Sequence, residues 1–125
     1  MPHLSARARN SPILCGMFDR LNRQHFRTAL PPLPVMWHRP LLSGGRVTYA
    51  AQFAVLADGS AAILVNPLLR QLKMWRYIEA TLLHEMVHAS LWHRGERPAA
   101  FNGHGPKFQK EMNRLAGAGA FARLW

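Results

Sequence analysis

Residues 75–93 of the chain read WRYIEATLLHEMVHASLWH. Apolar side chains recur at helical spacing in this stretch and form two strips, one of Ile78, Leu82, Met86 and Ala89 and a second of Leu83 and Val87. A helix that is apolar on most of its sides is a buried helix, and Gly95 is a typical residue at which such a helix stops. The stretch therefore predicts a long buried helix from near Trp75 to His93.

This helix carries the motif HEMVH at positions 84–88. Residues four apart lie one turn above each other, so His84 and His88 point the same way and can hold one Zn²⁺ between them. Glu85 lies about 100° further round the helix, where it can act as a general base on a water at the metal without being a ligand. Two histidines at the edge of a core with no metal are the alternative, but uncompensated burial of such groups costs several kcal/mol. The motif therefore favours a zinc site.

A catalytic zinc needs a third protein ligand and an open position. The metzincin pattern is excluded, because Leu91 stands where that class has glycine and Arg94 where it has histidine. Three downstream residues remain candidates: Glu96, His104 and Glu111.

His104 is the best of the three, because it lies in the segment NGHGP at 102–106, where two glycines allow tight turns and Pro106 opens a helix. Glu96 is expected in a surface ion pair, and Glu111 is expected to pair with Arg114. His93 lies about 180° from His84 on the helix and is excluded from the same metal.

The rest of the chain predicts an α+β fold in one domain over residues 11–125, after a flexible tail at 1–10. Ser11-Pro12 starts an N-terminal helix that runs to about Phe26. Three strands are expected at 35–37, 46–53 and 61–65, the last two joined by a hairpin at Asp58-Gly59. Asn66-Pro67 starts another helix, in which we expect Leu68, Leu69 and Leu72 to face inward. A last helix from Pro106 ends among Gly117 and Gly119.

Length and cysteine content exclude several classes of protein. The 125 residues contain no apolar run of the roughly 20 residues that a membrane helix needs. A single cysteine, Cys15, excludes an internal disulfide and a multi-cysteine zinc finger, and we expect it to be a small core residue. The first ten residues are followed by no continuous apolar stretch, which excludes an ordinary secretory signal. The expected location is therefore the cytoplasm.

The charge is strongly basic, with 16 Lys and Arg against 6 Asp and Glu, a formal net charge of +10. Arginine predominates, and its planar fork suits phosphate groups. The charge and the 4 tryptophans predict binding of single-stranded or unpaired DNA. The stretches expected to contact it are Trp75-Arg76-Tyr77 and Trp92 with Arg94 and Arg97. The alternatives are a charge that serves solubility alone and tryptophans that belong to the core.

With these motifs the chain resembles the SprT-like zinc metallopeptidase family. The resemblance rests on HEMVHA at 84–89, on NGHGP at 102–106 with Phe108 and Met112, and upstream on Phe18, Leu21-Asn22, Phe26, Leu30-Pro31, Trp37, Gly45 and Asn66-Pro67. It covers nearly all of residues 11–116 and implies a minimal zincin-like fold. It also implies that His84, His88 and His104 bind zinc and that Glu85 is the catalytic base. The best understood relatives degrade proteins cross-linked to DNA.

Many family members append a cysteine zinc ribbon that helps to bind DNA, and the single cysteine of this chain, Cys15, cannot build one. Any DNA dependence is therefore expected to come from the arginine and aromatic residues of the domain itself.

The function that fits best is a zinc endopeptidase acting as a monomer on proteins near or on DNA. A basic DNA-binding module with a structural zinc is the alternative, but a closed structural site has no use for a base such as Glu85. A hydrolase of small amides or formyl groups would use a cysteine ligand, for which Cys15 has no matching context.

Overall fold

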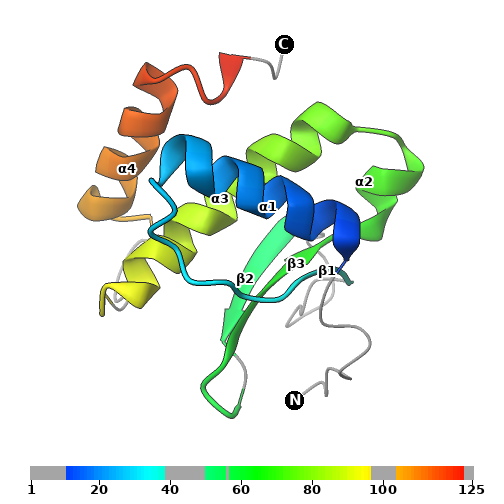
Figure 1. The fold of residues 1–125 in the computed structure, drawn as a ribbon, viewed down its shortest axis with the longest axis horizontal. Coiled ribbons are helices and arrows are strands. Elements are labelled where there is room, and N and C mark those ends of the chain that lie inside the picture. Colours follow the sequence, from blue (N-terminus) through cyan, green and yellow to red (C-terminus); the bar gives the residue numbers. More distant parts are fainter. Residues whose placement is uncertain (1–10, 39–49, 56, 97–103, 123–125) are drawn as a thin grey trace.

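A computed structural model describes residues 11–38, 50–55, 57–96 and 104–122 of the chain. The described part is α+β, as the sequence predicts, with four helices and one small sheet (Figure 1). In chain order the elements are α1 (Pro12–His25), β1 (Val35–Trp37), β2 (Ala51–Val55), β3 (Ala61–Val65), α2 (Pro67–Gln71), α3 (Trp75–His93) and α4 (Pro106–Gly117). None of the helices in these ranges is long and apolar enough to cross a membrane.

The sheet has the strand order β1-β3-β2. β1 runs parallel to β3, with Val35 opposite Ile63, and β2 runs antiparallel to β3, with Phe53 also opposite Ile63. The second strand differs from its prediction at both ends: Ala50 is not part of it, and it continues two residues past Phe53 to Val55. Positions 46–49 of the predicted strand lie outside the described residues. The extension occurs because the strand pairs with β3 as far as the turn that contains Gly59, where φ is +84°.

Helix starts follow the sequence closely. The Ser11 side chain accepts a hydrogen bond from the Leu14 N–H at 3.4 Å, and Asn66 accepts one from the Leu68 N–H at 3.0 Å. A proline occupies the first turn after each of these caps, where its missing N–H costs nothing. Both predicted starts are confirmed.

Three helices end in the same hydrogen-bond pattern around one residue with positive φ. That residue is Gly95 after α3 (φ +88°), Gly119 after α4 (φ +80°) and Lys73 after α2 (φ +56°). After α2, the Lys73 N–H donates to the Arg70 carbonyl and the next N–H donates to the Leu69 carbonyl, which is a Schellman motif. Glycine is the usual residue here, so Lys73 is the exception.

The core lies between the sheet and the helices. α3 packs against β2 and β3, and α1 packs against β1 and α3. The alternate residues of the strands that face these helices join one buried cluster, which includes Leu14, Phe18, Leu21, Val35, Ile63, Val65, Ile78, Leu82, Met86, Phe108 and Leu115. The other face of the sheet buries a smaller cluster of Met36, Ala54, Ala62 and Leu64. The long buried helix is thus confirmed, and it is the element that every other helix in the described ranges contacts.

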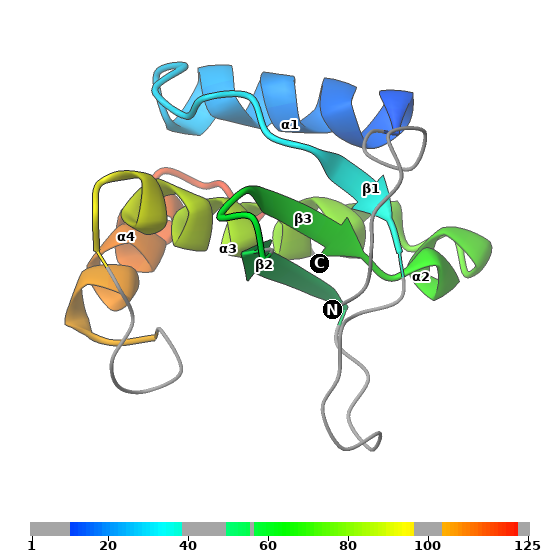
Figure 2. The ribbon, with the colours of Figure 1, turned by 90° about the horizontal axis from the view of Figure 1, so that it is seen from below.

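The prediction for α2 is wrong in part. Leu69 is buried, but Leu68 is 48% exposed and Leu72 is 58% exposed. A helix of five residues makes little more than one turn, so it offers only one of these side chains to the core. α2 lies at the N-terminal end of α3, while α4 lies at the other end (Figures 1 and 2).

Candidate metal centre

The three predicted histidines converge at one point. His84 and His88 come from successive turns of α3, and His104 comes from the segment just before α4. The Nε2 atom of His104 lies 3.2 Å from Nε2 of His84 and 3.2 Å from Nε2 of His88. Among the described residues, these are the ones that form a cluster able to hold a metal ion.

The spacing of these nitrogens fits zinc. Three nitrogens at about 2.0–2.1 Å from one ion, at tetrahedral angles, are separated from each other by about 3.3 Å. The two distances of 3.2 Å agree with this value. Three neutral imidazoles are also the donor set of many catalytic zinc sites. The residues present therefore fit the ion, and their role as its ligands stays a prediction.

Phe108 of α4 supports the cluster from one side. Its ring centre lies 5.0 Å from that of His84, 4.5 Å from that of His88 and 4.6 Å from that of His104. The side chain is only 3% exposed, so it is fixed by the core on its other side. Because a ring held in a packed core leaves the histidines few alternative rotamers, Phe108 keeps the three nitrogens together.

His84 and His88 are held in their metal-binding protonation state. Burial, and then the nearby His104, lowers the pKa of His84. Burial, with His84 and His104 close by, lowers the pKa of His88 to about 4. Both rings are therefore neutral near pH 7, and a metal ion does not have to displace a proton from either.

Glu85 lies beside the cluster and is buried, at 7% exposure. Its Oε1 accepts a hydrogen bond from the backbone N–H of Phe53 at 2.9 Å, and its Oε2 lies 3.8 Å from Nε2 of His84. Burial raises the pKa of Glu85 to about 7, against the opposing effect of the Phe53 N–H. A bound cation would favour the charged carboxylate and lower this pKa again. The carboxylate is thus fixed by one oxygen, and the other faces the histidines.

The two competing third-ligand candidates lie in ion pairs. Glu96 pairs with Lys107. Glu111 accepts two hydrogen bonds from Arg114, at 3.0 and 3.2 Å, as the sequence predicts. Neither carboxylate belongs to the histidine cluster.

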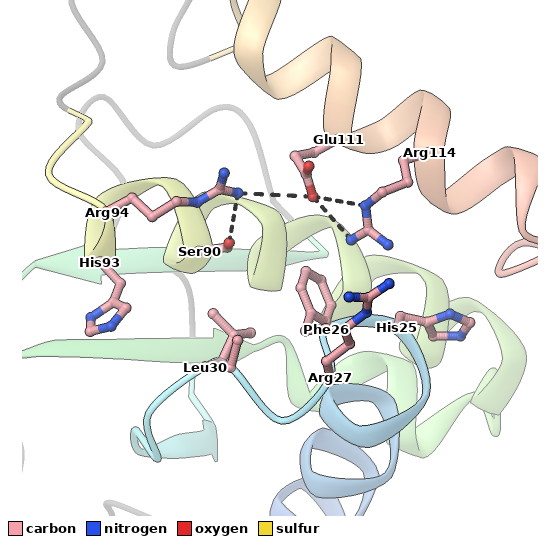
Figure 3. Close-up of a pocket in the computed structure, with 10 residues that line it drawn as sticks. His25, Phe26, Arg27, Leu30, Ser90, His93, Arg94, Glu111 and Arg114 are labelled. Atoms are coloured by element: carbon pink, nitrogen blue, oxygen red, sulfur yellow. Dashed lines mark hydrogen bonds and ion pairs between the residues drawn. The ribbon is translucent and has the colours of Figure 1, made fainter.

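A pocket of about 340 Å³ lies between the C-terminal ends of α1 and α3 and the side of α4 (Figure 3). His93, which the helix geometry places opposite His84, lines it together with His25. Within it, the Glu111 carboxylate joins Arg94 and Arg114, and Arg94 also donates to the Ser90 hydroxyl at 3.0 Å. This network binds α3 to α4 and is separate from the histidine cluster. Arg97 lies outside the described residues.

One feature of the site, the partner of Glu85, carries no sequence signal that identifies it, and a buried clamp at Asn22 lies outside the histidine cluster. The partner of Glu85 is a backbone N–H 32 positions away, which no residue type reveals. Asn22 is buried, and its side chain donates to the Leu30 carbonyl and accepts from the Leu30 N–H, at 2.9 and 3.2 Å. This clamp fixes the turn after α1, in which Arg27 and Thr28 both have positive φ.

The sequence matches the model of the SprT-like family over residues 14–123. The chain belongs to the SprT-like family. This membership agrees with the zincin-like arrangement of α3, the small sheet and α4 around the three histidines.

Similar SprT-like proteins include the DNA-dependent metalloprotease SPRTN of Bos taurus, which is 34% identical over 112 residues. SPRTN of Homo sapiens is 32% identical over 106 residues, and the DNA-dependent metalloprotease dvc-1 of Caenorhabditis elegans is 31% identical over 109 residues. These matches cover 84–86% of this chain but only 22%, 20% and 29% of the respective relatives. The chain thus corresponds to a fraction of each relative's length.

Proposed function

We propose that this chain is a zinc-dependent endopeptidase that hydrolyses proteins bound or cross-linked to DNA. One observation carries the peptidase part: a buried carboxylate, Glu85, has one oxygen anchored to the Phe53 backbone and the other beside a cluster of three histidines. A zinc that only stabilised the fold would not need this carboxylate. The DNA part is supported by the net charge of +10 and by relatives named as DNA-dependent metalloproteases.

In this proposal His84, His88 and His104 hold the zinc ion. When bound, the ion acts as a Lewis acid that polarises the scissile carbonyl and lowers the pKa of a water towards about 7. Glu85 takes the proton from the attacking water on Oε2. It then delivers that proton to the nitrogen of the leaving amine.

The Phe53 N–H has a separate part in the mechanism. It occupies Oε1 of Glu85, so Oε2 is the oxygen that exchanges protons. Because β2 is packed against α3, this hydrogen bond also fixes the direction of the carboxylate before substrate arrives. The backbone of β2 is therefore a positioning group for the base.

The test is the variant Glu85→Gln, with Glu96→Gln as a matched control. The amide keeps the size of the side chain and can still accept from Phe53, but it is not a base. We expect zinc content to stay near one ion per chain and cleavage of an unfolded protein substrate to fall by at least about 100-fold. Glu96→Gln removes the same charge from an exposed ion pair and should leave cleavage within about twofold. Equal cleavage by Glu85→Gln and wild type would overturn the proposal.

A further inference from the structure

The exposed large apolar side chains are concentrated at one corner of the molecule. Seven such residues occur in the described ranges, and five of them lie on α2, at the turn after it and on the first turn of α3. They are Leu68, Leu72, Met74, Trp75 and Tyr77, and we call this set the corner patch. Trp75 and Tyr77 are 39% and 40% exposed. A concentration of exposed apolar side chains in one region of a small protein is typical of a binding site.

The corner patch is also cationic. Arg70, Lys73 and Arg76 alternate with its apolar residues and are exposed, and no acidic residue occurs between positions 66 and 78. The next acidic side chain along the chain, Glu79, is paired with Arg20 of α1. The N-terminus of α3 adds to this potential, because it has no side-chain cap and no acidic residue in its first turn.

Two tryptophans give this corner a fixed aromatic surface. The Trp75 ring meets the Trp37 ring edge to face, with centroids 6.2 Å apart and planes at 76°. The Arg70 guanidinium lies 5.5 Å from the centre of the Trp37 ring. An aromatic ring that is held on one side and exposed on the other loses little conformational entropy when a ligand stacks on it.

The second stretch that the sequence singles out for DNA differs at its described residues, Trp92 and Arg94, because Trp92 is less exposed than Trp75 and Arg94 has an acidic partner. Trp92 packs edge to face on Phe53, with centroids 6.1 Å apart. Arg94 is engaged with Ser90 and Glu111, so its guanidinium has an acidic neighbour. The structure thus separates two stretches that the sequence alone leaves equivalent.

We infer that the corner patch binds single-stranded DNA. Unpaired bases stack on Trp75 and Tyr77, and phosphates lie against Arg70, Lys73 and Arg76. A purely apolar partner would leave these three cations unmatched, and duplex DNA would keep its bases away from the aromatic rings. Single-stranded DNA offers unpaired bases to the aromatic rings and phosphates to the three cations.

The position of the patch deepens the proposed function, on which its biological meaning rests. Tyr77 precedes His84 by seven residues, which is two turns of α3, so both lie on nearly the same side of the helix. Trp75 precedes His84 by nine residues and lies on the opposite side, so a strand that stacks on both rings passes round the first turn of α3. The separation along the helix axis is about 10 Å. A strand held at Tyr77 therefore presents its bound protein close to the histidine cluster.

Binding of a fluorescein-labelled single-stranded 20-mer of thymidine, measured by anisotropy from 50 to 200 mM salt, tests the inference. Arg76→Gln should weaken binding and flatten the log–log salt slope by about 0.7, the value for one phosphate on a single strand. Arg23→Gln, an exposed arginine on α1, is the matched control and should leave the slope unchanged. Tyr77→Ser should raise Kd about fivefold or more through lost stacking, and Tyr77→Phe should restore it.

Several outcomes would overturn the inference: equal losses in Arg76→Gln and Arg23→Gln, no effect of Tyr77→Ser, or equal affinity for duplex and single strands. So would a concentration-dependent dimer, seen by sedimentation, that Leu72→Ser dissociates while Ile13→Ser, another exposed apolar residue, does not. Cleavage of a protein substrate by wild type, assayed with and without single-stranded DNA, separates the two proposals. Cleavage without DNA binding rejects the patch alone, and DNA binding without cleavage rejects the peptidase alone.

Discussion

At the scale of the residue, the site depends on which side chain completes the histidine pair of α3. His104 brings its Nε2 to 3.2 Å from both partners, whereas the Glu111 carboxylate is held by Arg114 and Arg94. We expect His104→Ala to lower zinc affinity sharply and Glu111→Ala to leave zinc bound. Competition with a chromophoric chelator measures both affinities. Zinc that stays with His104→Ala and leaves Glu111→Ala would assign the third ligand to Glu111.

Single residues also show why part of the site could be predicted and part could not. The motif HEMVH can be recognised in the sequence because its two histidines and its glutamate lie within five positions of one helix. His104 is harder to assign as a ligand, because the sequence around it indicates only that tight turns are possible there. Its convergence with His84 needs the packing of α4 on α3. The Phe53 N–H is beyond sequence reasoning, because every residue except proline carries that group.

At the scale of the element, a bound metal would connect α3 to the start of α4. α4 buries only Phe108 and Leu115 fully, so much of its attachment is polar or partial. Removing zinc with a chelator should therefore raise amide hydrogen exchange in residues 106–117 well above that in α1. α1 is the internal control, because it packs on β1 and α3 and does not reach the histidine cluster. A uniform increase across both helices would mean that the ion stabilises the whole fold instead.

Elements were predictable where the decisive chemistry is local. Ser11-Pro12, Asn66-Pro67 and Gly95 set helix boundaries through their own backbone preferences and caps, and these boundaries are confirmed. The inward facing of Leu68 and Leu72 was wrong, because the side that α2 offers to the core depends on where α3 lies. Periodicity indicates an apolar face but does not indicate whether anything covers it.

At the scale of the whole molecule, charge is expected to control activity. If about five phosphates are engaged, the log–log plot of affinity for a single strand against salt should have a slope near −3.5. We expect single-stranded DNA to accelerate cleavage of a DNA-bound basic protein at low salt, because one strand raises the effective concentration of enzyme and substrate. The acceleration should shrink at physiological salt. Cleavage assays without DNA, with duplex and with single strands measure it; equal rates in all three would contradict the prediction.

Lys73, which follows α2, has a backbone conformation that costs stability and a charge that is expected to favour DNA binding. Lys73 holds φ at +56°, in a motif that α3 and α4 complete with glycine. Lys73→Gly should relieve that strain and make the fold more stable, by about 1 kcal/mol at most, as thermal unfolding would show. The same change removes a cation from the corner patch, so the variant should hold single-stranded DNA more weakly. A more heat-resistant protein that binds DNA less well would mean that this chain keeps a stability–function compromise in one side chain. Unchanged DNA binding would mean that Lys73 does not contribute to the binding of DNA.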